Sequence, residues 1–464
     1  MTHIPISAFR SIRLATAAVV IPLLASSFAD AAVDVAWVAP TRGVSIATDP
    51  ADNVFTLDYE YELGSDVTLT KRAATGELLW ESSVDNTQSP FWERAQWVAA
   101  DSEGNAVVCA TRMSGYSNPV VAASVVMKFG PDGELLWRHL YESGFDGSST
   151  RKCLVDADDN VYVLGIGIGR NGQRLKVRKF APDGSVLWSY LDPIGIGAPI
   201  NFKFTPDNHL AITARAITGS INGYARITLD GEEVWSLAGV QSLPVGDCAG
   251  DAFGNTYVVH GEYVNNGGTV IRKLDPAGAT IWQQVYAMGG LRIEVGSDHQ
   301  AVVGGFPNYG SAGAAFIKVD EQGELLWSNL NADGPLMLLL HAQMLLDEDD
   351  NAYLAAGTLV DMAVCKVKSD GTSAWTGTTV GGFAQGMALG HDQRSVFMVG
   401  GSTARLIDDT PFPTDLNGDG FVDGADLGML LSAWGSDDLT ADLDGNGVVD
   451  GADLGELLAA WTTP

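Results

Sequence analysis

The sequence predicts an all-β protein, an eight-bladed β-propeller closed by a strand from the N-terminal region and followed by a small α-helical calcium-binding module. Three observations lead to this expectation. A repeat of about 48 residues fills the middle of the chain, a length typical of propeller blades. Glycine makes up 54 of the 464 residues, which favours turns over long helices. Two acidic loops stand near the C-terminal end. A seven-bladed ring with irregular ends is the alternative.

Gly-x-x-x-Trp sequences mark the repeat, and a basic residue lies five positions before each glycine. We expect the glycine to supply a positive φ in a turn and the tryptophan to pack between adjacent blades. The basic residue is expected on the outer strands, either in a salt bridge or extended along the surface. The seven tryptophans are Trp80, Trp137, Trp188, Trp235, Trp282, Trp327 and Trp375. The seven basic residues are Lys71, Lys128, Lys179, Arg226, Lys273, Lys318 and Lys366.

A second element, Asp-x-x-x-Asn followed by β-branched or aromatic residues, precedes each copy and adds an eighth unit. The eighth tryptophan is found at Trp37, which stands 12 residues before Asp49. The last unit has expected strands at 384–389, 395–400 and 404–407 but none with a tryptophan. We therefore expect the strand that carries Trp37 to complete this blade and to remove an exposed sheet edge. The element is intact at Asp49, Asp101, Asp156, Asp251 and Asp347 and degenerate at Thr205, Gly296 and Gly390.

Each unit reads as four short strands joined by tight turns, as at 95–100, 105–111, 125–129 and 134–140 in the second unit. This hairpin pattern describes one propeller blade. The innermost strands would line a central channel, for which two interpretations stay open: a polar ring that binds a ligand, or a solvated lining. The polar residues near the starts of these strands are Gln96, Arg151, Asn201, Asp247, Arg292, Gln343 and Gln385.

Composition excludes several classes of protein. The 27 Lys and Arg against 57 Asp and Glu give a formal charge of −30, which argues against a nucleic-acid surface. With 46% hydrophobic and 18% charged residues, the chain can bury a core and is not a disordered composition. Nucleophile-elbow, metalloprotease-helix and phosphate-loop motifs are absent from the sequence. The glycines at 165, 167 and 169 lie in a strand pattern without a following helix, so they do not indicate a dinucleotide site.

The N-terminal segment predicts export. Arg10 and Arg13 precede an apolar run at 14–28, and Ala29-Asp30-Ala31 offers small residues for cleavage, so residues 1–31 are expected to be a signal peptide. An uncleaved membrane anchor is the alternative; no other segment is long and apolar enough to span a membrane. The four cysteines permit two disulfides in three connectivities, although their apolar surroundings favour buried free thiols. They are Cys109, Cys153, Cys248 and Cys365.

The composition changes after residue 407. A linker at 408–414 contains two prolines, and two twelve-residue loops follow at 415–426 and 442–453. Both loops match the pattern of a calcium site, with side-chain oxygens at positions 1, 3 and 5, glycine at 6, a backbone carbonyl at 7, and acidic residues at 9 and 12. An apolar helix is expected after each loop, and two Ca²⁺ ions are predicted. The predicted ligands are Asp415, Asn417, Asp419, Phe421, Asp423 and Asp426 in the first loop and Asp442, Asp444, Asn446, Val448, Asp450 and Asp453 in the second.

Two resemblances follow from these motifs. The repeats from Trp37 to Asp408 resemble PQQ-like propellers of the quinoprotein alcohol dehydrogenase superfamily, whose blades carry a Gly-x-x-x-Trp motif. The chain lacks that family's vicinal cysteine pair, and it is more similar to noncatalytic exported propellers. Residues 415–464 resemble a type I dockerin, a family that also has Asp at loop position 12. The resemblance implies a cohesin-like partner, although positions 10 and 11 are Gly-Ala in both loops and lack the hydroxyl pair of cellulosomal dockerins.

The sequence therefore predicts a secreted or cell-surface, noncatalytic binding protein. Its propeller would present a surface, with a polysaccharide as one expected ligand, and its dockerin-like module would tether it to an extracellular assembly. The enzymatic alternative is a polysaccharide lyase or glycoside hydrolase recruited through the dockerin, and a quinone-dependent dehydrogenase ranks third. Carboxylates gathered with His or Arg at one mouth of the channel would favour an enzyme, whereas a diffuse lining would favour binding.

Overall fold

The computed structural model describes residues 33–461 apart from short gaps. The expected signal peptide and most of the linker lie outside the described residues, as do Asp419 and Phe421 of the first acidic loop. The gaps are at 60–66, 84–90, 115–119, 143–148, 170–171, 195, 197, 216–220, 242–245, 262–267, 308–312, 333–342, 358–359, 409–413, 418–421 and 439.

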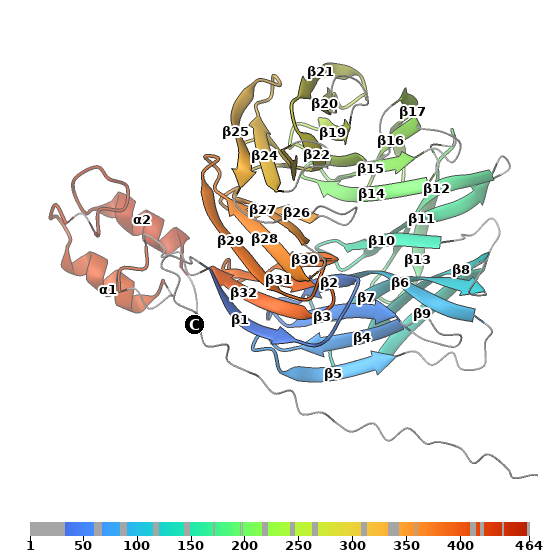
Figure 1. Ribbon diagram of the computed structural model, residues 1–464, viewed down its shortest axis with the longest axis horizontal. Coiled ribbons are helices and arrows are strands. Elements are labelled where there is room, and N and C mark those ends of the chain that lie inside the picture. Colours follow the sequence, from blue (N-terminus) through green and yellow to red (C-terminus); the bar gives the residue numbers. More distant parts are fainter. Residues whose placement is uncertain are drawn as a thin grey trace, which may run out of the picture.

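Eight antiparallel sheets of four strands form a ring (Figure 1), and this confirms the eight-bladed propeller. The first strand of each sheet contacts the first strands of the neighbouring sheets, so these strands are the innermost. Blades 1 to 8 are numbered by them in chain order. They are β2 (Ser45–Thr48), β6 (Phe91–Ala100), β10 (Ser149–Val155), β14 (Ala198–Thr205), β18 (Gly246–Gly250), β22 (Gly289–Val295), β26 (Gln343–Leu346) and β30 (Gly386–Leu389).

Three further strands complete each blade. The second strands are β3 (Val54–Tyr59), β7 (Ala106–Ser114), β11 (Val161–Gly169), β15 (His209–Arg215), β19 (Thr256–Gly261), β23 (Ala301–Phe306), β27 (Ala352–Gly357) and β31 (Ser395–Val399). The third strands are β4 (Val67–Arg72), β8 (Val120–Phe129), β12 (Gly172–Phe180), β16 (Ile221–Thr228), β20 (Thr269–Leu274), β24 (Ala314–Val319), β28 (Asp361–Val367) and β32 (Thr403–Asp408). The outermost strands are β5 (Leu78–Ser83), β9 (Leu135–Glu142), β13 (Val186–Leu191), β17 (Glu233–Gln241), β21 (Thr280–Tyr286), β25 (Leu325–Ala332), β29 (Ser373–Val380) and β1 (Val33–Ala39).

The N-terminal strand closes the ring. β1 pairs antiparallel with β32, and Trp37 lies opposite Arg405 in the register. Blade 8 is therefore built from the two ends of the propeller, as expected from the displaced tryptophan. Such closure hides a sheet edge that would otherwise be open to pairing with another chain.

The repeated tryptophan of each blade packs on the next blade. Every glycine of the Gly-x-x-x-Trp motif has a φ between +83° and +89°, which only glycine adopts without strain. The glycine also leaves room for the tryptophan of the preceding blade: a Cβ at Gly133 would lie 2.9 Å from the ring of Trp80, and one at Gly76 would lie 2.8 Å from that of Trp37. The indole N–H of Trp37 donates to the carbonyl of Ala74 at 2.8 Å. Both expectations for this motif are confirmed.

The basic residue of each blade lies opposite the tryptophan, on the third strand, and forms an ion pair with an aspartate of the first turn, which joins the first and second strands. Lys71 and Asp49 are 2.9 Å apart, and both side chains are almost fully buried. The basic residues are thus salt-bridged and do not extend along the surface. Arg405 is the eighth member of the set and pairs with Asp392 at 2.9 Å. The remaining pairs are Lys128–Asp101, Lys179–Asp156, Arg226–Asp207, Lys273–Asp251, Lys318–Asp298 and Lys366–Asp347.

In four blades the basic residue and the tryptophan donate to the same carbonyl of the following blade. Lys128 and Trp137 share the carbonyl of Pro182, and Arg405 and Trp37 share that of Ala74. Lys179 with Trp188 and Lys273 with Trp282 repeat the arrangement on Leu229 and Glu321. One buried cation therefore joins the inner turn of its own blade to the outer turn of the next.

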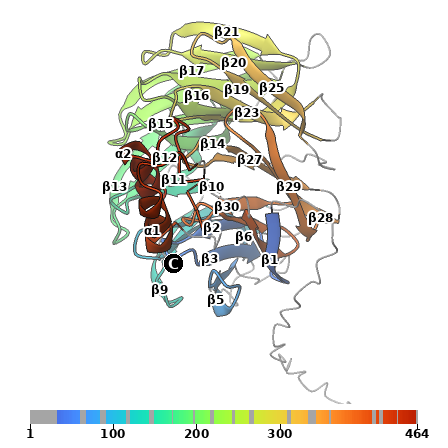
Figure 2. The same cartoon turned by 90° about the vertical axis from the view of Figure 1, so that its left-hand side faces the viewer.

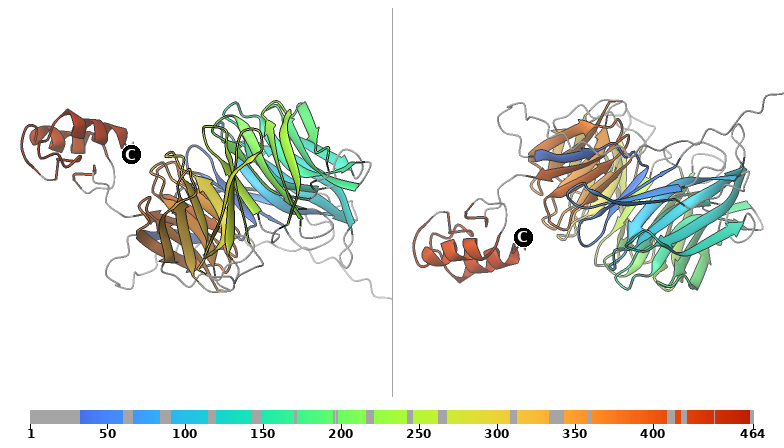
Figure 3. Two further views of the ribbon diagram at one scale, coloured as in Figure 1. Left: turned by 90° about the horizontal axis from the view of Figure 1, so that it is seen from above. Right: turned by 90° about the horizontal axis from the view of Figure 1, so that it is seen from below.

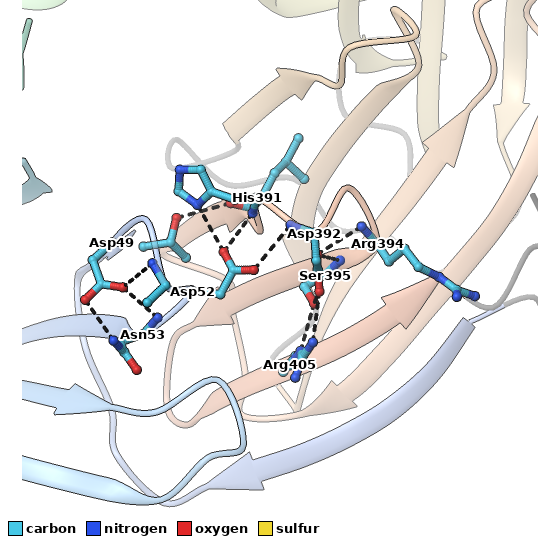
Figure 4. A network of polar contacts seen from close by, with 11 residues as sticks. Asp49, Asp52, Asn53, His391, Asp392, Arg394, Ser395 and Arg405 are labelled. Atoms are coloured by element: carbon cyan, nitrogen blue, oxygen red, sulfur yellow. Dashed lines mark hydrogen bonds and ion pairs between the residues drawn. The ribbon is translucent and has the colours of Figure 1, made fainter. Parts of the chain in front are cut away.

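Hydrogen bonds between side chains of one first turn and the first turn of the neighbouring blade form a second connection between blades. Asp52, with a φ of 57°, accepts a bond of 2.7 Å from the backbone N–H of His391, and the His391 ring nitrogen lies 3.0 Å from the same oxygen (Figure 4). This contact joins blade 1 to blade 8. Equivalent aspartates join blade 3 to blade 2 and blade 7 to blade 6, through Asp159 with Ser102 and Asp350 with Ser297.

All four cysteines are buried thiols. Cys109 and Cys153 lie in one apolar cluster between blades 2 and 3. Burial raises the pKa of Cys365 to about 12, so this thiol stays protonated at neutral pH.

Two short helices follow the propeller, α1 (Gly424–Ser432) and α2 (Gly451–Ala459). They lie beside each other (Figure 2), outside the propeller in both views of Figure 3. A small core holds them together, with Val422, Leu430, Val449 and Leu457 fully buried. Neither they nor any other described helix is long and apolar enough to cross a membrane.

Ring closure by β1 can be tested at Trp37. We expect Trp37→Ala to lower the free energy of unfolding by roughly 3–5 kcal/mol, because a large buried side chain is truncated and its bond to Ala74 is lost. Val35→Ala on the same strand, where Val35 is 44% exposed, is the control and should change it little. Urea denaturation of the two variants measures the difference, and equal stability would show that β1 does not hold the ring.

Candidate functional site

The second acidic loop gathers three carboxylates. Oxygens of Asp442, Asp444 and Asp453 all lie within 4.8 Å of one another. They occupy loop positions 1, 3 and 12, which the sequence assigns to calcium. Asp442 and Asp453 are buried, whereas Asp444 is exposed, so the cluster opens to solvent on one side.

The loop backbone holds these carboxylates in place. Gly447, with a φ of 90°, turns the chain so that its N–H donates to Asp442 at 2.8 Å. The N–H of Asn446 donates to Asp442 at 3.1 Å and to Asp444 at 2.9 Å. The sharp turn expected at loop position 6 is therefore present, and it aims the first two carboxylates at the loop centre.

Asp453 connects the loop to α2. It is fully buried and accepts bonds from the backbone N–H groups of Leu443 at 2.7 Å, Asp444 at 3.1 Å and Asp450 at 2.7 Å. These donors, that of Asp450 foremost, lower the pKa of Asp453. Asp450 caps α2 by accepting from the N–H of Ala452. The residue at loop position 12 therefore joins the loop to the first turn of the helix.

The first loop repeats this geometry where the structure describes it. Asp426 is fully buried and accepts from the N–H groups of Asn417 at 3.1 Å and Asp423 at 2.8 Å. Asp423 caps α1 through the N–H of Ala425. The equivalent residues of the two loops thus share their backbone contacts, although only the second loop is described in full.

The chemistry of the donor set fits a hard cation. Calcium takes six to eight oxygen ligands, mainly from carboxylates and carbonyls. Residues 408–464 contain no Lys or Arg that could neutralise the loop carboxylates. In the second loop the side chains of Asp442, Asp444 and Asp453, with the carbonyl of Val448, would hold such an ion and so relieve their mutual repulsion.

The innermost strands place a second group of polar residues around the channel. The first turn of each blade starts at the first residue of the Asp-x-x-x-Asn element or its degenerate form, for example Asp49 in blade 1 and Thr205 in blade 4. In every blade, the residue three positions before this start is apolar or cysteine and buried, as are Ile46 and Phe202. Side chains alternate across a strand, so the residue four positions before the turn lies on the opposite face. We call these eight residues the inner ring: Ser45, Trp97, Lys152, Asn201, Asp247, Arg292, Gln343 and Gly386.

The inner ring matches the expected set in blades 4 to 7. In blade 1 no residue was expected, and in blades 2, 3 and 8 the expected residue lies one position too early. β-Bulges insert Gln96 into β6 and Arg151 into β10 just before the ring position, so the ring residues there are Trp97 and Lys152. In blade 8, Gln385 precedes β30. Blades 4 and 6 have the same bulge just before Asn201 and Arg292. In blades 2 and 3 the residue in the bulge is itself polar, and the prediction from sequence therefore fell one position too early.

Charged residues gather on one side of the channel. The Lys203 ammonium donates to Asp247 at 2.9 Å, to Glu294 at 2.7 Å and to the carbonyl of Ile293 at 2.7 Å. Lys203 and Glu294 were not among the expected residues. They stand two positions after Asn201 and Arg292, so strand alternation is the signal that points to them.

Asp247 is the centre of this cluster. It is fully buried and also accepts bonds from Asn201 at 2.7 Å and from the N–H of Cys248 at 2.9 Å. Burial opposes its ionisation, but the Lys203 and Arg292 cations outweigh that effect and lower the pKa of Asp247. Glu294 behaves in the opposite way: burial raises its pKa although Lys203 is adjacent.

Lys152 extends the cluster into blade 3. Its ammonium donates to the side-chain oxygen of Asn201 at 2.9 Å and lies 4.8 Å from the centre of the Trp97 ring. Within the described part of the chain, no carboxylate lies at ion-pair distance from it. Burial, with repulsion from Lys203, lowers the pKa of Lys152 to about 8.

Comparison with known proteins supports the fold. No family model and no curated protein matches the sequence. The solved structure described as the Dos1 propeller matches with a TM-score of 0.53 and 10% identity, over 80% of this chain and 92% of that one. A eukaryotic initiation factor matches at a TM-score of 0.42 and 12% identity over 73% and 88%, and a protein of unknown function from Bacteroides caccae at 0.32 and 16% over 54% and 85%. At these identities the likeness shows the fold alone, which is a β-propeller.

Proposed function

We propose that this is a secreted, noncatalytic propeller protein whose C-terminal module binds two calcium ions and tethers the propeller to an extracellular assembly or cell surface. The observation that carries the proposal is the gathering of Asp442, Asp444 and Asp453 within 4.8 Å in a loop whose sequence pattern recurs 27 residues earlier. Export rests on the sequence pattern of residues 1–31.

A repeated apolar surface on the module supports a protein partner. Leu431 and Trp434 are 51% and 48% exposed, and the residues one repeat later, Leu458 and Trp461, are 51% and 40% exposed. Exposed aromatic and aliphatic side chains of this kind are typical of interaction surfaces. Because both repeats present the same pair at the end of a helix, a cohesin-like domain is the partner that this proposal names.

The enzymatic alternative has one observation in its favour. Asp247 and Glu294 lie together with Arg292 on one side of the channel, rather than in a diffuse lining. Lys203 bonds to both carboxylates, however, so each is already engaged in an ion pair. A general acid or base needs a carboxyl group that can reach a substrate proton, and this arrangement therefore favours binding over polysaccharide cleavage.

Calcium binding can be measured on the full chain. We expect isothermal titration of the chelator-treated protein to give two ions per chain, and Asp442→Asn combined with Asp444→Asn to reduce this to one, because the second loop then loses two carboxylate ligands. Asp437→Asn removes an exposed acid between the loops and is the matched control, which should leave two ions bound.

Two results would contradict the calcium proposal. One is an absence of calcium uptake by the parent protein, and the other is an equal loss of binding in the Asp437→Asn control. Thermal unfolding of each variant in excess calcium checks that the propeller remains intact.

A further inference from the structure

The wall of the channel is asymmetric. The residues two positions after the inner ring form a second ring on the same face of each innermost strand. This second ring has only alanine on blades 8, 1, 2 and 5, at Ala388, Ala47, Ala99 and Ala249, and blades 8 and 1 also carry the smallest inner-ring residues. The charged residues of both rings all lie on blades 3 to 6. Small side chains therefore stand across the channel from a cluster of large charged ones.

The two lysines of that cluster differ in how many hydrogen bonds they donate. Lys203 uses three bonds on Asp247, Glu294 and the backbone. Lys152 has one described hydrogen bond, to Asn201, although an ammonium group carries three donors. Asn201 in turn donates to Asp247, which fixes the amide oxygen that holds Lys152. The Lys152 ammonium is therefore positioned, but it is not neutralised by a carboxylate of the described chain.

The charges of the cluster limit what it can bind. Lys152, Lys203 and Arg292 supply three positive charges, and Asp247 and Glu294 supply two negative ones, so one positive charge is in excess. A monoanion balances this excess, whereas a phosphate dianion would add uncompensated charge beside two carboxylates. Lys152 is partly exposed.

We propose that Lys152, held by Asn201 and flanked by Trp97, forms a binding site in the channel for a small ligand that carries a single carboxylate. This site goes beyond the tethering function and does not depend on calcium. The ammonium of Lys152 donates to the carboxylate, and the small residues of blades 8 and 1 stand on the other side of the channel.

The test is calorimetric titration of the full chain with acetate, benzoate and glucuronate, each against its neutral analogue acetamide, benzamide or glucose. We expect at least one carboxylate to bind and its neutral analogue not to bind. Lys152→Gln should weaken binding about tenfold, the value for one charge-assisted hydrogen bond. Lys152→Arg, which keeps the charge, should stay within about threefold of the parent.

Lys368→Gln removes an exposed lysine elsewhere on the propeller and is the control for net charge. Binding of none of the three carboxylates, or an equal loss in Lys152→Gln and Lys368→Gln, would overturn the proposal. Repeating the titration in calcium and in chelator separates this site from the C-terminal loops, because only binding at the loops should respond.

The affinity should also depend on pH. The titratable groups whose charges act on Lys152 are Lys203, Asp247, Glu294 and, on the opposite face of β18, Cys248. The pKa of Lys152, about 8, means that the cation is lost above that pH. We expect carboxylate affinity to be constant between pH 6 and about 7.5 and then to fall, by pH 10, to the roughly tenfold weaker affinity of Lys152→Gln. Lys152→Arg should stay constant up to pH 10, since arginine remains charged. A parent protein with the same flat profile would contradict the assignment to Lys152.

Discussion

The structure depends on one contact made between successive blades: in seven blades a tryptophan indole lies on a left-handed glycine of the next blade. In six of these the indole N–H also donates to a carbonyl of the same turn. At Trp37 the glycine is Gly76 and the carbonyl is that of Ala74. A cation, Arg405 in this blade, bonds to the same carbonyl and to an aspartate of its own blade. A propeller blade cannot bury both of its faces alone, so this contact places each sheet against its neighbour. The chain closes the ring by supplying the last copy from its N-terminal strand.

These contacts lie on the third and outermost strands, and this leaves the innermost strands free to differ between blades. The tryptophan and the basic residue recur around the ring, whereas the inner ring runs from Gly386 and Ser45 to Lys152 and Asp247. A repeat scaffold can therefore carry a single, asymmetric cluster without loss of the blade-to-blade packing. The second C-terminal loop shows a similar division, because Asp453 is buried and shapes the loop, whereas Asp444 is in the same carboxylate cluster but exposed to solvent.

Much of the fold could be predicted from the repeat itself. The glycine and tryptophan spacing predicted the turns, the blade contacts and the role of Trp37, since each follows from a pattern that recurs in every unit. The ion-pair partners, the bulges and the loop hydrogen bonds could not be predicted from the repeat. In the three degenerate units the ion pair uses Asp207, Asp298 or Asp392, two positions later in the turn, because only the carboxylate needs to reach the cation. Bulges shifted the ring residue from Arg151 to Lys152, and only the pairing of strands reveals them. Residue type and spacing predicted two calcium loops, and their calcium binding stays a prediction, but the bonds that orient Asp453 could not be read from the sequence.

The account to be tested is a propeller closed by its own N-terminal strand and joined to a calcium-dependent module. Amide hydrogen exchange of the full chain, measured with calcium and with a chelator, is its most direct test. Exchange reports local opening in each segment separately. The account predicts that β1 is as protected as the outermost strands of the other blades under both conditions. It also predicts that α1 and α2 are protected only with calcium. Rapid exchange in β1, or helices equally protected after chelation, would contradict it.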